Sequence, residues 1–182
     1  MKFKILLLFV VVFNSCSRKP TFTEAFNCKV EKFSNLERIE DVKNIFSVYY
    51  PDNWKTNFYY DNNQSSVFTA DTTKQLKETT LLDITHISNK IEFDSNFLKQ
   101  FKTNLSQLQL TEINADKILF KGKPSFYSEA IGISKNFNYS VFNLFIKLDD
   151  KNYIHSKIEV YGESFRKKRI CKGINLLEKT IF

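Results

Sequence analysis

Apolar and polar residues alternate along most of the chain, which predicts β-strands as the main elements. In the first half the alternation marks strands at residues 46–50, 56–60, 66–70 and 81–88. In the second half it returns at residues 117–120, 125–133, 142–148 and 154–160. Between these segments lie residues that favour turns, namely Pro51-Asp52-Asn53, Gly122-Lys123-Pro124, Asn136 and Asp149-Asp150. The pattern predicts consecutive antiparallel strands joined by short turns.

Two segments change to helical spacing. The first is expected to run from Ser95 to Leu108, with Asp94 or Ser95 as its N-cap, on an apolar stripe of Phe97, Leu98, Phe101, Leu105 and Leu108. The second follows Gly162 and closes the chain, on a stripe of Ile170, Ile174, Leu177 and Ile181. We therefore expect one helix between the two groups of strands and one at the C-terminus.

Two pairs of adjacent tyrosines bear on how the layers are arranged. In Tyr49-Tyr50 and in Tyr59-Tyr60, a strand must project one ring to each of its faces. Both faces of the sheet are then expected to be partly covered, as in an antiparallel β-sheet flanked by helices on both faces. This predicts an α+β fold of the α/β/α sandwich type. The alternative is that these tyrosines lie at a solvated surface.

The first residues have the layout of an export signal. Lys2 and Lys4 precede nine consecutive apolar residues, Ile5 to Phe13, and small or polar residues follow. A membrane-spanning helix needs about 20 apolar residues, so this run is too short to be a stable anchor. We expect residues 1–15 to be a signal peptide that is removed.

The end of this leader, Phe13-Asn14-Ser15-Cys16, resembles the lipobox of bacterial lipoproteins. The resemblance implies a lipoprotein signal peptide and acyl chains on Cys16, and two or more chains suffice for stable membrane attachment. Ser17, Arg18 and Lys19 resemble neither an inner-membrane retention signal nor a surface-export signal. The implied location is the bacterial cell envelope, at the periplasmic face of the outer membrane. An ordinary secretory signal with an incidental cysteine is the alternative.

Composition predicts a single ordered domain after the leader. Residues 16–30 are expected to be a lipidated tether or N-terminal arm, and residues 31–182 one globular domain of ordinary size. The formal net charge of +7 favours anionic lipid or polysaccharide as a contact in the envelope. Nucleic acid fits the basic charge but conflicts with export, so we expect no nucleic-acid partner.

Once Cys16 carries lipid, Cys28 and Cys171 remain as an even pair. In an oxidising compartment such a pair is a disulfide candidate, and the bond would join the N-terminal arm to the last helix. Two buried free thiols are the alternative, because spacing in sequence does not establish distance in space.

The segment from Phe46 to Lys55, FSVYYPDNWK, resembles the opening signature F-S-[IV]-x-x-P-x-x-W of PsbP-like domains. The order of expected elements is also similar from Phe46 to Phe182, although Asn53 stands where a glycine often precedes the tryptophan. The PsbP-like superfamily contains extrinsic photosystem subunits, a nuclear Ran-binding protein and bacterial envelope lipoproteins. The resemblance implies a binding or assembly protein, and fold alone does not specify which function.

A search for chemistry gives no catalytic residue, cofactor site or metal site. The sequence has no G-x-S-x-G elbow, phosphate-binding loop, dinucleotide fingerprint or H-E-x-x-H pattern. Its two histidines lie in separate expected strands: His86 is expected to be hydrogen-bonded and partly buried, and His155 to be solvated. Asp52, Asp61, Asp149 and Asp150 fall at turns, where aspartate serves the backbone.

Two groups of residues are candidates for contact with a partner. Trp54, Tyr59 and Tyr60 could form an aromatic binding surface around the first hairpin, unless Trp54 fills the core. The run Arg166-Lys167-Lys168-Arg169 could meet lipid headgroups or an acidic partner, but four consecutive charges spread around a helix, which favours a solvated helix start.

Two classes of function follow. The favoured one is a non-catalytic binding or assembly module, anchored to the membrane through lipid on Cys16 and contacting another envelope protein. The alternative is a small, hydrolase-like envelope enzyme. For a binding module we expect an apolar or aromatic surface patch. For an enzyme we expect a cleft that contains carboxylates together with His86 or His155, with perturbed pKa values.

Overall fold

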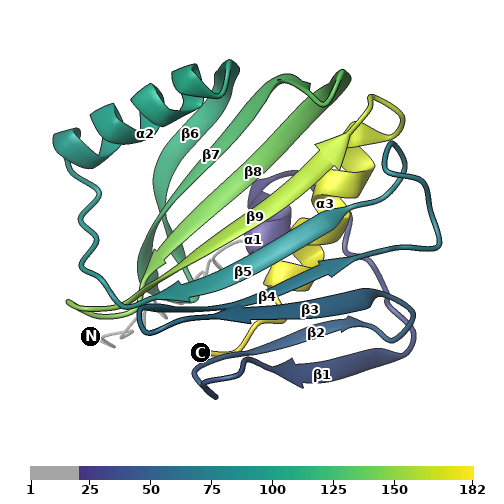
Figure 1. The fold of residues 1–182 in the computed structure, drawn as a ribbon, viewed down its shortest axis with the longest axis horizontal. Coiled ribbons are helices and arrows are strands. Elements are labelled where there is room, and N and C mark those ends of the chain that lie inside the picture. The colour runs from purple at the N-terminus through teal and green to yellow at the C-terminus, as the bar shows by residue number, and fades with distance from the viewer. Residues whose placement is uncertain (1–20) are drawn as a thin grey trace, which may run out of the picture.

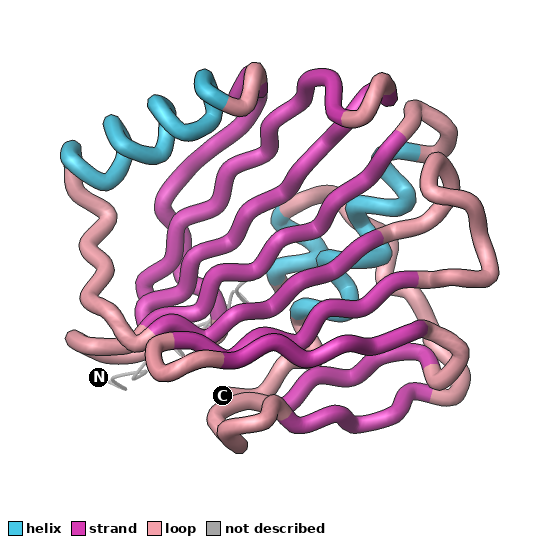
Figure 2. The backbone as a smooth tube through the Cα atoms, viewed as in Figure 1, coloured by secondary structure: helices cyan, strands magenta, loops and turns pink. Residues whose placement is uncertain are grey.

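A seven-stranded antiparallel sheet forms the centre of the protein in the computed structural model, which describes residues 21–182 (Figure 1). The predicted signal peptide and Cys16 lie outside the described residues. The strand order is β3-β4-β5-β9-β8-β7-β6. The strands are β3 (Lys55–Tyr60), β4 (Gln64–Ala70), β5 (Leu81–Ile87), β6 (Leu110–Phe120), β7 (Lys123–Ser134), β8 (Phe137–Lys147) and β9 (Tyr153–Tyr161). The predicted antiparallel sheet is therefore present, and strands predominate along the backbone (Figure 2).

A separate two-stranded sheet precedes the main one and corrects part of the prediction. The segment expected as the first strand of the main sheet is β2 (Ser47–Pro51), which pairs with the unpredicted β1 (Leu36–Glu40). The turn between them is closed by Asp41, whose carboxylate accepts hydrogen bonds from the backbone N–H groups of Lys43, Ile45 and Phe46. A buried carboxylate that satisfies three donors favours the local hairpin.

Three helices accompany the sheets: α1 (Phe22–Ala25), α2 (Ser95–Gln107) and α3 (Arg166–Leu177). Helix α2 begins where the spacing predicts, because the Asp94 side chain accepts the backbone N–H of Phe97 at 2.9 Å. Helix α3 is shorter than its apolar stripe, since Ile181 leaves the helix and pairs with Ser47 of β2. Within residues 21–182, no helix is both long and apolar enough to cross a bilayer.

The two long helices contact alternate side chains of the central strands. On β8, Phe142 and Ile146 belong to the main core with Ile174 of α3, whereas Phe145 packs with Phe97 and Phe101 of α2. Helix α2 lies beside β6 and β7 and away from β3 and β4 (Figure 1). The α2 side of the sheet is thus covered over only part of its width, which makes room for the site described below.

Helix α3 approaches β9 closely. A Cβ atom added to Gly173 would lie 2.5 Å from the Cγ2 of Ile158, closer than any ordinary contact, so only glycine fits. Gly173 is fully covered, and Ile158 is among the largest fully buried side chains. The absence of a side chain at residue 173 therefore sets the spacing between helix and sheet.

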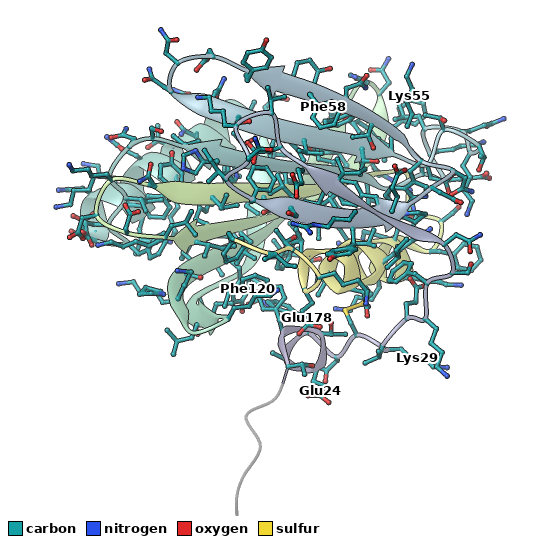
Figure 3. The ribbon with its side chains drawn as sticks, turned by 90° about the horizontal axis from the view of Figure 1, so that it is seen from below. Glu24, Lys29, Lys55, Phe58, Phe120 and Glu178 are labelled. Carbon is teal, nitrogen blue, oxygen red and sulfur yellow. A yellow bond between two sulfur atoms is a disulfide. The ribbon has the colours of Figure 1, made fainter. Side chains whose placement is uncertain are left out.

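The N-terminal arm packs on the α3 side of the molecule. Thr21 and Glu24 form a capping box around α1, and the buried Phe22 ring lies 4.8 Å from the ring of Phe120. Seen from below, α1 with Glu24 lies beyond Glu178 and α3 relative to the sheet (Figure 3). Cys28 and Cys171 are joined by a disulfide, which links the arm to α3. From residue 21 onward, the expected tether is therefore packed against the domain.

Candidate binding groove

A groove of about 550 Å³ lies between the C-terminal half of α2 and strands β8 and β9. We call it the α2 groove. Its apolar side chains come from α2 and the sheet, namely Phe101, Leu105, Leu108, Tyr139, Val141, Phe145 and Tyr161. Its polar side chains include Asn143, His155, Lys157 and Glu159 on the sheet, and Asn104 and Ser134 also line it. The groove is a mainly apolar trough with polar groups along the sheet.

The groove opens because the two halves of α2 pack differently. In the N-terminal half, the rings of Phe97 and Phe101 lie 5.3 and 5.5 Å from the ring of Phe145, so edge-to-face aromatic packing holds the helix at a distance from the sheet. In the C-terminal half, Leu105 faces the smaller Ala130 and Val141. Smaller side chains under a helix held at that height leave a trough between helix and sheet.

His155 sits in the groove and is held by two neighbours. Its ring stacks on Phe145 with centroids 4.0 Å apart, and its Nε2 lies 3.0 Å from the side-chain oxygen of Asn143. That oxygen can only accept, so Nε2 carries the hydrogen and Nδ1 is left as an acceptor. The prediction that His155 is solvated is wrong, because the ring is half-buried against Phe145.

Burial makes this histidine a neutral group. Desolvation, reinforced by the positive charge of Lys157, lowers the pKa of His155 to about 3. The ring therefore stays uncharged across the physiological range and can offer a hydrogen-bond acceptor without a charge. Such a group recognises a polar donor on a partner. It is poorly matched to general-acid chemistry near neutral pH, which needs a protonated ring.

The charged residues of the groove are paired within the sheet. Lys157 Nζ lies 3.4 Å from Oδ2 of Asp83, and Oδ1 of the same carboxylate accepts a 2.6 Å hydrogen bond from the Ser66 hydroxyl. The Tyr139 hydroxyl donates to Glu159, and burial together with the Glu159 charge raises the pKa of that phenol. The groove thus presents compensated charges instead of a strong field of one sign.

The arrangement also bears on the choice between a binding module and an enzyme. Within residues 21–182, no group of three His, Cys, Asp or Glu side chains is placed to hold a metal ion. His155 and Glu159 are four residues apart on one strand, about 13 Å by strand geometry, and each has another partner. His155 has the perturbed pKa expected of an enzyme, but its hydrogen-bond partner is the amide of Asn143 and not a nucleophile.

The aromatic surface expected around the first hairpin is not assembled in the structure. Trp54 is only 7% exposed and packs in the main core, where Lys172 Nζ lies 4.7 Å from the centre of its ring. Tyr59 and Tyr60 are exposed at the other end of β3. The inclusion of Trp54 in an exposed binding surface is therefore wrong, while Tyr59 and Tyr60 remain a candidate surface.

The basic run at the start of α3 is largely engaged with the protein. Arg169 is buried, Arg166 lies 3.5 Å from Glu129, and Lys167 Nζ donates to the Phe26 carbonyl at 3.0 Å. The expectation of a solvated helix start holds for Lys167 and Lys168, which are both exposed. His86 is 3% exposed, deeper than the partial burial expected, and desolvation lowers its pKa.

Sequence reasoning did not identify the α2 groove. Its floor combines residues from β8 and β9, and its wall comes from a helix placed by packing, so spacing along the chain does not bring them together. One signal was available. Asn143 is a buried amide in a strand that is otherwise rich in Phe, Leu and Ile, and a buried polar group in such a strand requires a partner.

Comparison with known proteins supports the fold. No protein-family model matches the sequence, and no curated protein matches it. Among solved structures, cyanobacterial PsbP (CyanoP) from Synechocystis sp. PCC 6803 has a TM-score of 0.56 at 14% identity, covering 85% of this chain and 96% of its own. The Ran-binding protein Mog1p from Saccharomyces cerevisiae has a TM-score of 0.54 at 11% identity, covering 82% and 96%.

A third structure, from Bacteroides thetaiotaomicron, has a TM-score of 0.52 at 11% identity and covers 81% of this chain but 48% of its own. At such identities the similarity establishes the fold alone. The PsbP-like resemblance of the opening segment is therefore confirmed at the level of the fold.

Proposed function

We propose that this protein is a lipid-anchored module of the bacterial envelope that binds a partner protein in the α2 groove. The observation that carries the proposal is the groove's combination of an apolar trough with a neutral hydrogen-bonding group, His155, on its floor. An amphipathic segment of a protein fits such a site, because its apolar side chains enter the trough and its polar groups meet the polar side chains of the floor.

The rim of the groove supports a protein partner. Leu108, the C-cap of α2, and Ile133 near the end of β7 are 64% and 66% exposed. Large aliphatic side chains exposed at one end of an apolar trough are a contact surface that association would bury. Paired charges at the floor cost less to desolvate than isolated charges would.

The location rests on the leader sequence and is part of the proposal. Lys2, Lys4 and the apolar run from Ile5 to Phe13 support export, and Ser15-Cys16 supports lipidation. The disulfide between Cys28 and Cys171 fits an oxidising compartment. We place the protein at the periplasmic face of the outer membrane, with Cys16 as its anchor. Mass spectrometry of the native protein and of Cys16→Ala tests this, and an N-terminus without acyl groups contradicts it.

A photo-crosslinking experiment tests the groove. A photoreactive phenylalanine analogue at Leu108 or Ile133 is expected to capture a partner in cells, and the same analogue at Tyr59 serves as the matched exposed control. For the captured partner, Leu108→Asp should raise Kd at least about tenfold, because a charge enters an apolar contact, whereas Tyr60→Asp should leave Kd unchanged. Capture through Tyr59 together with an unchanged Kd for Leu108→Asp would assign binding to β3 instead.

A further inference from the structure

The N-terminal arm and the α2 groove lie on opposite faces of the sheet. The Phe22 ring of the arm lies 6.1 Å from the ring of Phe142 on β8. The adjacent residues Val141 and Asn143 line the groove. Because neighbouring side chains of a strand point to opposite faces, the arm and the groove are separated by the full thickness of the sheet.

The arm is fixed to the domain at several points. Cys28 is bonded to Cys171, and the Asn175 side chain accepts from the Glu31 N–H at 3.0 Å and donates to the Lys29 carbonyl at 3.1 Å. The Thr23 hydroxyl donates to Glu178. Thr21, where the described chain begins, is therefore fixed on the α3 side of the molecule and cannot slide around it.

The short distance in sequence between Thr21 and Cys16 limits how the domain can lie on the membrane that would hold the lipid. Five residue steps separate Cys16 from Thr21, and even a fully extended chain spans at most about 18 Å over five residues. A domain of this length has a radius of gyration of about 15 Å, hence a width of about 40 Å. A chain this short cannot pass around the domain to bring the opposite face to the same membrane.

The surface around Thr21 has the chemistry of a headgroup contact. A shallow hollow of about 520 Å³ beside Thr21 is lined by Val30, Leu119, Lys121 and Lys179. Two carboxylates, Glu31 and Glu178, also line it, and Glu178 is engaged by the Thr23 hydroxyl. Val30 and Leu119 are 65% and 64% exposed, and Lys179 and the neighbouring Lys29 are exposed as well. Apolar tips flanked by lysines suit a negatively charged bilayer surface, because the lysines are attracted to anionic headgroups.

We propose that this surface, made of Lys29, Val30, Leu119 and Lys179, rests on the anionic headgroups of the bilayer that carries the lipid. The α2 groove then opens away from that bilayer and receives its partner from the aqueous side. The inference deepens the proposed function, since it rests on lipidation of Cys16, and it identifies the membrane-facing and partner-facing sides.

Lysine footprinting on vesicles tests the orientation without altering the domain. The native lipidated protein is reconstituted into vesicles of phosphatidylethanolamine and phosphatidylglycerol, and Cys16→Ala protein mixed with the same vesicles is the control. Acetylation of each lysine is quantified by mass spectrometry. We expect Lys29 and Lys179 to react at least about threefold more slowly in the anchored protein, and Lys99 and Lys102 on α2 to react at the same rate in both. All four lysines are exposed.

The orientation would be overturned if each of the four lysines reacted at the same rate in the anchored and the control protein. Slower reaction of Lys99 and Lys102 in the anchored protein would also overturn it. A native protein without acyl groups would instead refute the proposed anchor. In that case coupling the Cys16 thiol to a maleimide lipid tests the orientation separately, because Cys28 and Cys171 are bonded to each other. The same footprint, read on the coupled protein, then supports or overturns the membrane-facing surface.

Discussion

Arg169 shows how one side chain can hold several backbone segments together. Its guanidinium is buried and donates to four carbonyl oxygens at 2.8–3.0 Å, those of Thr79, Tyr161, Gly162 and Ser164. These carbonyls come from the loop before β5, the end of β9 and the turn into α3. A planar group with five donors suits this arrangement better than an ammonium does.

Replacement of Arg169 should therefore be costly. We expect Arg169→Ala to lower the free energy of unfolding by about 3 kcal/mol, because buried carbonyls lose their donors. Arg169→Lys keeps the charge but not the fork of donors, and should lose about half as much. Urea unfolding followed by circular dichroism measures both. A loss below about 1 kcal/mol for Arg169→Ala would show that water replaces the guanidinium.

His155 makes stability depend on pH. Its folded-state pKa is about 3, below the unfolded value of about 6.5. Above pH 6.5 the His155 ring is neutral in both the folded and the unfolded state. As pH falls from 6.5 toward 3, the ring is protonated in the unfolded state but not in the folded state, so the free energy of unfolding decreases. We expect a loss of about 3 kcal/mol between pH 7 and pH 4 from this residue.

The control for this prediction is His155→Phe, which retains a ring to stack on Phe145 but does not titrate. Its stability should fall less steeply over the same pH range, while His86, whose pKa is also lowered, continues to contribute with the same sign. Imidazole NMR signals report the titration directly. A His155 ring that titrates near pH 6.5 would contradict both its neutrality and its role in the groove.

At the scale of elements, spacing along the chain predicted what depends on local periodicity. Strands and the start of α2 follow from alternation and from the Asp94 cap. The pairing of β2 with β1 depends on Asp41 closing a turn, and the α2 groove depends on the heights of side chains that are far apart in sequence. Such contacts are set by tertiary packing, which periodicity does not encode.

The contact between α3 and β9 can be tested with a double-mutant cycle. Gly173→Ala should lower the free energy of unfolding by about 1 to 3 kcal/mol, because the new methyl group overlaps Ile158. Ile158→Ala removes the atoms that would clash, so the double variant should be more stable than the sum of the single changes predicts, by about 1 kcal/mol. Strict additivity, measured by urea unfolding, would show that the helix shifts instead.

At the scale of the whole molecule, the disulfide joins the two ends of the described chain. Cys28 and Cys171 are 143 residues apart in sequence. A bond that closes so long a loop restricts the unfolded chain strongly. The sequence indicated this pairing only through the number of cysteines and the expected compartment, since it contains no distance between the two residues.

Removal of this bond should destabilise the protein substantially. We expect the double variant Cys28→Ala/Cys171→Ala to lose about 3 to 5 kcal/mol. Wild-type protein in reductant should lose a similar amount, and the Cys16→Ala variant should unfold like wild type. Urea unfolding with and without reductant checks all three. Equal stability with and without reductant would mean that the two thiols are not bonded in solution.

The same bond has a consequence for how the domain could be released from the proposed membrane anchor. Residues 28–171 form a covalent ring that includes every strand. A protease that cuts an exposed turn within the ring, such as Asp149-Asp150, leaves two fragments joined through sulfur. Both fragments would stay attached to the proposed anchor at Cys16. Proteolytic release of the domain then requires a cut between residues 16 and 28, or reduction of the bond before the turns are cut.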